Sequence, residues 1–295
     1  MRPHQNRFVV LSMTDPIRPI LHFIHGNSFP AGTYRQFLQF LERDYDVRSL
    51  DVHAHNPKYP VTDGWPALVQ ELIDELAARY SQPVILLGHS MGGGLALLAA
   101  QRRPDLVSCV VMLDTPVVVG WRATLLRGAK ALGLNDHVPP AKFSAKRRNL
   151  WPSAEAAYQH FAGKQVFASW APEVLRDYIT SGLEEDQGNM VLRFRRDIET
   201  AVYRTLPHNM ASVLKRGFPV PIGFVGGIDS VECRQAGLDA TKRLVGKYFK
   251  QIPGGHLFPM ESPELAAATT HQMIESLLHP AEAKLRRPRN QASNG

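Results

Sequence analysis

The sequence predicts an α/β fold, in which a doubly wound and mostly parallel sheet carries an inserted helical cap. Short apolar runs alternate with amphipathic stretches along most of the chain. One such run ends in a serine flanked by glycines, and one long segment in the middle of the chain interrupts the alternation. Strands that alternate with helices form mostly parallel sheets with helices on both faces.

The predicted strands are short apolar runs, and the predicted helices have apolar residues at helical spacing. The helix expected near residue 66 illustrates the second pattern, with Pro66 in its first turn and Thr62 or Asp63 as its cap. We expect strands at Phe8–Leu11, Ile20–Ile24, Tyr45–Val52, Val84–Leu87, Cys109–Leu113, Pro221–Val225 and Tyr248–Ile252. We expect helices at Tyr34–Leu41, Pro66–Tyr80, Leu95–Gln101, Ala236–Val245 and Pro263–Leu278.

The alternation stops between residues 117 and 206, a segment too long to be a loop. Proline-led start signals and three of the four tryptophans predict that it folds as a helical cap over the core. The core then consists of residues 1–116 and 207–280, and residues 281–295 form a basic, disordered tail. Most cap aromatics should pack the cap onto the core. A few, with Trp121 and Trp170 as candidates, should line an apolar substrate pocket.

Composition limits the function classes. The formal charge of +7 comes partly from clusters in the tail and around Lys142–Arg148. Neither cluster is interleaved with aromatics as in nucleic-acid modules, so we interpret both as solvated surface. No apolar run is long enough for a membrane span or a signal peptide. Cys109 and Cys233 have no metal or redox spacing, which favours a cytoplasmic protein without a metal.

The candidate nucleophile is Ser90, within Gly88-His89-Ser90-Met91-Gly92. This G-x-S-x-G pattern follows a predicted strand and precedes a predicted helix, which is the context of a nucleophile elbow. A serine hydroxyl becomes a good nucleophile only when a base and backbone donors flank it. The flanking glycines allow the tight turn that exposes the serine.

The candidate general base is His256, which follows the last predicted strand and the pair Gly254-Gly255. The preferred orienting carboxylate is Asp229, just beyond the strand Pro221–Val225, which completes the chain order Ser, Asp, His. Asp114 is the alternative, because it ends the strand that follows the nucleophile and satisfies the same order. A turn or cap role for Asp114 explains its position equally simply.

An oxyanion hole requires two N–H donors. We assign one to the backbone of Met91, directly after the nucleophile, and the other to the backbone of Asn27, after the predicted strand Ile20–Ile24. His25 is expected to hold this loop in place rather than to take part in catalysis. Ser28 and Leu257 are further candidates for substrate contact, because each adjoins a predicted catalytic loop.

These motifs together resemble the α/β-hydrolase superfamily. His25-Gly26, the elbow, Gly226-Gly227-Ile228-Asp229 and Gly255-His256 occur in the family's order and spacing over about residues 8–116 and 207–278. Asp51–His55 is similar to the family's Asp-x-Arg-Gly-His-Gly turn, with the Arg and both Gly positions altered. The resemblance implies acyl transfer to water without a cofactor. The presence of Ser90 differs from the aspartate of the dehalogenase and epoxide-hydrolase branches.

The sequence therefore predicts a serine hydrolase that cleaves carboxylic esters of small to medium apolar substrates through an acyl-enzyme. Carbon–carbon (meta-cleavage type) and thioester hydrolysis by the same triad are alternatives, although Leu257 stands where meta-cleavage enzymes usually carry tryptophan. A non-catalytic ligand sensor is a third hypothesis. The expected partner is a small acyl substrate, without nucleic acid, membrane insertion or a metal, and the sequence makes no prediction of oligomeric state.

Overall fold

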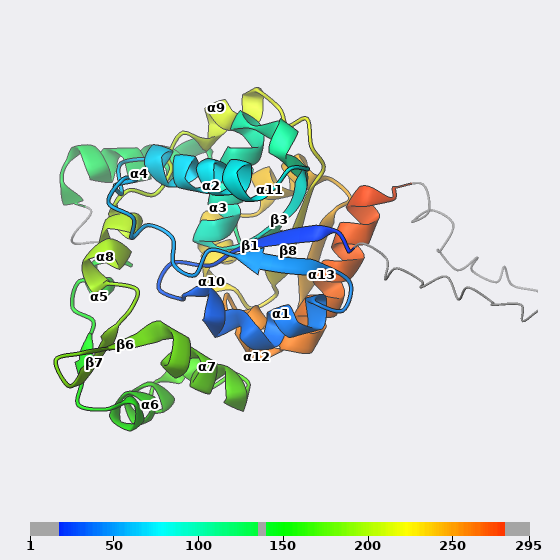
Figure 1. Cartoon of the computed structure of the whole chain (residues 1–295). Coiled ribbons are helices and arrows are strands. Elements are labelled where there is room, and N and C mark those ends of the chain that lie inside the picture. Colours follow the sequence, from blue (N-terminus) through cyan, green and yellow to red (C-terminus); the bar gives the residue numbers. More distant parts are fainter. Residues whose placement is uncertain (1–17, 135–139, 281–295) are drawn as a thin grey trace, which may run out of the picture.

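The computed structural model describes residues 18–134 and 140–280. Within these residues six strands form a parallel sheet in the order β2-β1-β3-β4-β8-β9 (Figure 1). This arrangement confirms the predicted doubly wound sheet, while the strand expected at Phe8–Leu11 lies outside the described residues. The strands are β1 (Ile20–Ile24), β2 (Asp46–Ser49), β3 (Val84–His89), β4 (Val107–Leu113), β8 (Ile222–Gly227) and β9 (Phe249–Ile252).

Successive strand residues point to opposite faces of the sheet, and each face is covered by helices. In β3, Ile85 and Leu87 pack in one buried cluster, and Val84 and Leu86 pack in the other. The first cluster lies beneath α1 (Arg35–Leu41) and α13 (Pro263–Leu278). The second lies beneath α2 (Pro66–Arg79), α3 (Met91–Arg102) and α11 (Asp239–Val245). Figure 1 shows α1 and α2 on opposite sides of the sheet.

Shorter helices connect these layers. They are η1 (Ala31–Tyr34), η2 (Pro104–Leu106), α9 (Met210–Lys215), α10 (Val231–Ala236) and α12 (Phe258–Glu261). Helix α2 begins without the predicted side-chain cap, because Trp65 occupies the cap position at φ 64° and Asp63 instead pairs with Lys130. All six strands run in the same direction, so the loops after β1, β3, β4, β8 and β9 meet at one edge of the sheet.

Residues 117–206, which we call the cap segment, contain strands as well as the predicted helices (green in Figure 1). Gln187 and Gly188 have φ values of 49° and 77°, which is the backbone of a two-residue hairpin turn. An entirely helical cap is therefore not what the structure shows. Its strands are β5 (Leu150–Trp151), β6 (Leu183–Asp186) and β7 (Asn189–Leu192), and its helices are α4 (Gly120–Ala131), α5 (Ala141–Ser144), α6 (Ala154–Ala162), η4 (Gln165–Phe167), α7 (Pro172–Gly182) and α8 (Arg196–Arg204).

Aromatic packing and an ion pair attach the cap segment to the core. Tyr178 of α7 is fully buried and contacts Phe29, which follows β1, with the ring centroids 5.6 Å apart. Asp177 accepts a hydrogen bond at 2.7 Å from Arg35 of α1. Helix α7 thereby lies against the loop that follows the first strand of the sheet, and the cap segment borders the edge where the strand-end loops meet.

Candidate active site

Ser90 lies between β3 and α3 in a sharp turn, with φ 52° and ψ −113°. A non-glycine residue in such a conformation stores about 1–3 kcal/mol of strain, which the surrounding structure must hold. Close backbone packing explains the flanking glycines. A Cβ atom at Gly88 would lie 2.3 Å from the backbone of Gly92, and one at Gly92 would lie 2.0 Å from the Ile24 carbonyl oxygen. The turn leaves the side chain of Ser90 partly exposed.

His256 lies in the loop after β9 with its ring between Ser90 and a carboxylate. Its Nε2 atom is 3.0 Å from Ser90 Oγ, and its Nδ1 atom is 2.7 Å from Asp114 Oδ2. The carboxylate fixes the tautomer, because a neutral imidazole that donates from Nδ1 presents a free acceptor at Nε2. His256 is therefore oriented to accept the Ser90 proton.

The carboxylate beside His256 belongs to Asp114 and not to Asp229, which corrects the preferred sequence assignment. Asp114 follows β4 directly and is completely buried. It also accepts hydrogen bonds from the Gly227 N–H at 2.7 Å and the Ser230 hydroxyl at 2.5 Å. Asp229 is exposed, and among the described residues its carboxylate forms no hydrogen bond with His256. The loop predicted to supply the acid instead supplies donors to Asp114.

The surrounding charges set the protonation states of this pair. Burial disfavours protonated His256, but the hydrogen bond and charge of Asp114, with Glu232 and Glu261 adding to them, outweigh burial and raise the pKa of His256. Burial likewise opposes ionisation of Asp114, but its hydrogen bonds from His256, Ser230 and Gly227 and the charge of His256 lower its pKa. The Asp114 carboxylate therefore favours the protonated form of His256.

The two predicted oxyanion donors, Met91 and Asn27, follow the ends of β3 and β1. Met91 is the first residue of α3, so its N–H has no acceptor within the helix. Asn27 lies in the loop after β1, where its side-chain amide donates to the Glu199 carbonyl at 3.1 Å. Ser28 donates from its hydroxyl to the Glu199 carboxylate at 2.6 Å. The cap segment thus anchors the loop whose backbone we predicted to hold an oxyanion.

Tyr34 and His89 connect this loop to the loop of His256, a link that sequence reasoning missed. The Gly26 N–H donates to the Tyr34 hydroxyl at 3.0 Å, and that hydroxyl donates to His89 Nδ1 at 2.7 Å. His89 Nε2 then donates to the backbone oxygen of His256 at 2.9 Å. Burial, with the nearby His256, lowers the pKa of His89 to about 3, so the neutral ring has the one donor and one acceptor that this chain needs.

Gly26 and His25 complete the structure of the loop. A Cβ atom at Gly26 would lie 2.8 Å from His89 Nδ1 and 2.9 Å from the Tyr34 hydroxyl oxygen, so only glycine permits the hydrogen-bonded chain. His25 Nδ1 lies 2.8 Å from the Gly26 carbonyl oxygen, and its Nε2 accepts from the His53 N–H at 2.8 Å. His25 therefore has the structural role expected from its position. Ala54, where the family turn has glycine, has φ 70°.

A cavity of about 640 Å³ opens at this edge between the core and the cap segment. Ser28, His256 and Leu257 line it, as the sequence predicted for Ser28 and Leu257. The tryptophans do not: Trp121 is 63% exposed on α4, and Trp170 is buried against Phe29 and other aromatic rings. The cap aromatics that line the cavity are Phe143, Phe161, Phe167 and Tyr203.

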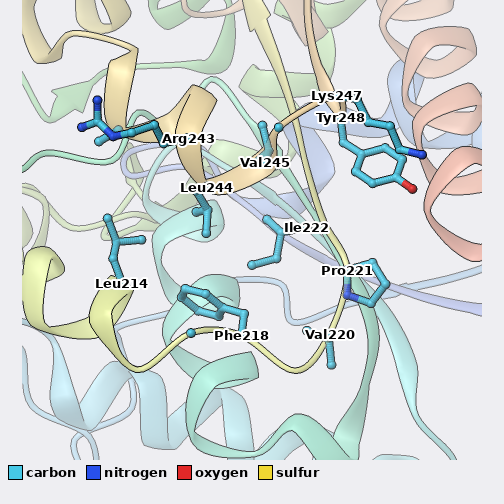
Figure 2. A pocket seen from close by; sticks show the side chains of 13 residues that line it. Leu214, Phe218, Val220, Pro221, Ile222, Arg243, Leu244, Val245, Lys247 and Tyr248 are labelled. Carbon is cyan, nitrogen blue, oxygen red and sulfur yellow. The ribbon is translucent and has the colours of Figure 1, made fainter.

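A second hollow, of about 740 Å³, lies at the other end of the sheet (Figure 2). It is lined by apolar side chains such as Leu214, Phe218 and Leu244, together with Ile222 at the start of β8. His256 is absent from its lining, whereas it lines the smaller cavity. The smaller cavity is therefore the one next to His256, whose ring is 3.0 Å from Ser90 Oγ.

Within residues 18–134 and 140–280, three side chains that could ligate a metal lie together beside Ser90. One group of three potential metal ligands, Asp114, Glu232 and His256, has its ligand atoms within 4.8 Å of one another. Two of its members already hydrogen-bond to each other, and His256 also faces Ser90.

Arg147, placed by the sequence in a solvated cluster, is instead paired with Glu199 at 2.9 Å. No helix in residues 18–134 and 140–280 is long and apolar enough to cross a bilayer.

Comparison with known proteins identifies the family. The model of a family described as "Alpha/beta hydrolase family" matches residues 23–269. The chain belongs to the α/β-hydrolase family. This α/β hydrolase is 27% identical over 262 residues to a putative non-heme haloperoxidase of Mycobacterium phage D29, with 84% of each chain covered. It is 27% identical to the uncharacterized hydrolase YugF of Bacillus subtilis, covering 85% of this chain and 88% of that one.

A solved structure shows the same fold. The crystal structure of E-2-(acetamidomethylene)succinate hydrolase superimposes on this α/β hydrolase with a TM-score of 0.71 at 20% identity, covering 87% of this chain and 91% of that one. Among partial matches, the mouse sn-1-specific diacylglycerol lipase ABHD11 is 32% identical over 191 residues, covering 62% of this chain and 57% of the lipase. The relatives support a hydrolase of the esterase type at the level of the family.

Proposed function

We propose that this α/β hydrolase is a serine hydrolase that cleaves carboxylic esters through an acyl-enzyme. The observation that carries the proposal is the relay of Ser90, His256 and Asp114, with heavy-atom distances of 3.0 and 2.7 Å. A nucleophile, a base and an orienting carboxylate at these distances are what acyl transfer requires. The adjoining cavity of about 640 Å³ has room for a small to medium acyl or alcohol group.

The proposed reaction has two stages, acylation of Ser90 and hydrolysis of the acyl-enzyme. His256 Nε2 takes the Ser90 proton while Ser90 Oγ attacks the ester carbonyl carbon, and Asp114 stabilises the imidazolium. The N–H groups of Met91 and Asn27 stabilise the oxyanion that develops on the carbonyl oxygen. His256 then protonates the departing alcohol. Water then attacks the acyl carbon while His256 removes its proton, and His256 returns that proton to Ser90 Oγ as the acid is released.

Ester cleavage is preferred because curated relatives are named for it. A pimeloyl-[acyl-carrier protein] methyl ester esterase of Xanthomonas axonopodis is 24% identical over 160 residues, covering 54% of this chain and 49% of the esterase. Thioester and carbon–carbon cleavage need the same triad, so a substrate panel of esters, thioesters and vinylogous diketones separates them. A ligand sensor would bind without turning over any member of the panel.

The decisive experiment is labelling with a fluorophosphonate probe, which reacts with an activated serine. We expect the probe to label the wild type and Ser212→Ala, a control at an exposed serine outside the cavity. We expect Ser90→Ala to be unlabelled and to lose roughly 10⁴-fold or more in kcat/KM on p-nitrophenyl butyrate, because nucleophile removal costs on this scale. Circular dichroism should show that Ser90→Ala remains folded. Hydrolysis by Ser90→Ala at a rate near the wild type would refute the mechanism.

A further inference from the structure

The cavity above the catalytic residues is charged unevenly. The core contributes carboxylates near His256. The cap segment contributes two cations, one just before β5 and one between α6 and η4. The core carboxylates are Asp229, Glu232 and Glu261. The charged cap residues are Arg147, Lys164 and one carboxylate, Glu199. A neutral apolar ester would make no favourable electrostatic contact with these charges. The charged lining therefore points to a substrate that carries a charge itself.

Arg147 is already fully engaged within the protein. Its Nη1 atom donates to Glu199 Oε2 at 2.9 Å, and its Nη2 atom donates to the Tyr178 hydroxyl. Burial disfavours the charge of Arg147, but the neighbouring Tyr178 and Glu199 more than compensate and raise its pKa. Glu199 also accepts the hydrogen bond from Ser28. The Arg147 guanidinium therefore adds positive electrostatic potential to the cavity. Both carboxylate oxygens of Glu199 already accept hydrogen bonds, from Ser28 and from Arg147.

Lys164 differs because it forms no ion pair. Among the described residues no carboxylate oxygen lies within 4.0 Å of its amine. The amine is instead 5.4 Å from the centre of the Phe161 ring. The Arg147 guanidinium lies 5.7 Å from the centre of the same ring. The side chain is partly buried, and burial together with the charge of Arg147 lowers the pKa of Lys164. A cation in this setting is held at a cost that an entering anion removes.

Resting on the proposed function, we propose that Lys164, assisted by the field of Arg147, binds an anionic group of the substrate. The preferred substrate is then an ester whose far end carries a carboxylate or phosphate. The rings of Phe143, Phe161 and Phe167 line the same cavity and provide apolar contact for the chain between the anion and the ester. The reaction itself is unchanged, because the anion is bound and not transformed.

The core carboxylates favour one orientation of an anionic substrate in the cavity. Glu232 lies 3.9 Å from His256 Nδ1, and Glu261 accepts a hydrogen bond from the Gly255 N–H at 2.9 Å. These negative charges repel an anion from the catalytic end of the cavity. A substrate with one anionic end is therefore favoured in the orientation that places that end at Lys164 and the neutral ester at Ser90.

The test compares mono-p-nitrophenyl esters of adipic and pimelic acid with the same esters whose free carboxylate is methylated. An ω-phosphonoalkanoate p-nitrophenyl ester provides the phosphate arm. For Lys164→Met we expect kcat/KM on the better anionic ester to fall roughly 10- to 100-fold, which is the usual worth of a hydrogen bond to a charged group. The methylated ester should change less than about twofold, and Lys164→Arg should retain the preference. Lys142→Met, at an exposed lysine outside the cavity, is the matched control.

The proposal is overturned if the wild type prefers neither anionic ester over its methylated form, or if Lys164→Met lowers activity on both forms equally. A readout independent of turnover is calorimetric binding of monomethyl adipate and its phosphonate analogue to Ser90→Ala. Removal of Lys164 in that background should weaken binding of at least one by a similar factor, and no change contradicts the proposal. If probe labelling of Ser90 persists without an anionic preference, only the subsite is wrong. If labelling fails but Lys164-dependent binding remains, only the hydrolase mechanism is wrong.

Discussion

The polar side chains next to Ser90 in the strand-end loops have partners within the protein, whereas one charged side chain that lines the cavity from the cap segment forms no ion pair with the described residues. In the core loops, Ser90, His256 and Asp114 contact one another, and the Tyr34–His89 chain joins the two loops around them. In the cap segment, Arg147 is paired but Lys164 has no carboxylate partner among the described residues. The core is organised before substrate arrives, which is how electrostatic catalysis operates. Under the proposed anion subsite, the substrate supplies the partner that Lys164 lacks.

This difference has a testable consequence. Substitutions in the core loops should lower the rate on every ester by a similar factor, whereas substitutions at Lys164 should act on some esters and not others. If a core substitution lowered the rate on some esters and not others, this division of roles between the core loops and the cap segment would be wrong.

The largest effect is expected at Asp114. We expect Asp114→Asn to lower kcat roughly 10⁴-fold on anionic and neutral esters alike, because an amide no longer selects the productive tautomer of His256. Asp229→Asn, the matched substitution on the neighbouring strand end, should change kcat less than about threefold, since Asp229 lies in the cavity without contacting the imidazole. Steady-state kinetics on purified variants provides the measurement.

The thermal midpoint of both variants serves as the control for folding, because Asp114 is completely buried and bonded to Gly227 and Ser230. A larger loss of kcat in Asp229→Asn than in Asp114→Asn would return the acid role to Asp229.

The same pair of aspartates shows where sequence reasoning reaches its limit. Ser90 and His256 are found from local patterns at strand ends, and chain order then admits an acid after either β4 or β8. These strands are neighbours, with Leu113 opposite Val225, so both aspartates arrive at the same edge. What separates them is side-chain direction and burial. Asp114 turns inward with φ 44° toward donors from the β8 loop, which no spacing in the chain encodes.

The centre of the sheet was predictable for the opposite reason. Strands β1, β3, β4 and β8 are mostly apolar runs that are largely buried, and the sequence pattern identifies such runs. The small sheet of the cap segment was missed because its strands are short and carry charged residues such as Glu184 and Glu185 in β6. The tryptophans were misjudged because size and aromaticity predict burial or ligand contact equally. Trp170 packs inward, and Phe161 lines the cavity instead.

A smaller effect is expected at Tyr34. Tyr34→Phe removes the acceptor of the Gly26 N–H and the donor to His89, so the oxyanion loop and the His256 loop lose their link. We expect kcat to fall roughly 10- to 30-fold with KM nearly unchanged, because a lost buried hydrogen bond costs about 1–3 kcal/mol. The rate of probe labelling should fall in parallel.

Tyr158→Phe, on a partly exposed tyrosine of the cap segment, is the matched control and should leave kcat unchanged. If Tyr34→Phe merely loosened the fold, its thermal midpoint would fall while kcat on the folded fraction stayed constant. A loss confined to the anionic ester would mean that the core chain influences substrate choice, contrary to the comparison.

The smallest effect concerns pH. His256 must be neutral to act as a base, so kcat/KM falls as pH drops through its pKa. That pKa is raised: burial lowers it, but Asp114, Glu232 and Glu261 outweigh burial. His89, 5.0 Å away between ring centres, stays neutral because its own pKa is lowered to about 3. The acidic limb of the pH profile is therefore expected above pH 6.5, the ordinary histidine value.

Glu232→Gln isolates one contribution to this limb. The Glu232 carboxylate is 3.9 Å from His256 Nδ1 and half-exposed, so water and salt screen it. Its removal should move the limb of kcat/KM down by about 0.2–0.5 pH unit at low salt, and by less at high salt. Glu155→Gln, at an exposed carboxylate in α6, should leave the limb in place. An upward shift in Glu232→Gln, or a wild-type limb at or below pH 6.5, contradicts the electrostatic account of His256. The neutral and anionic esters should report the same limb, because the group that titrates belongs to the core.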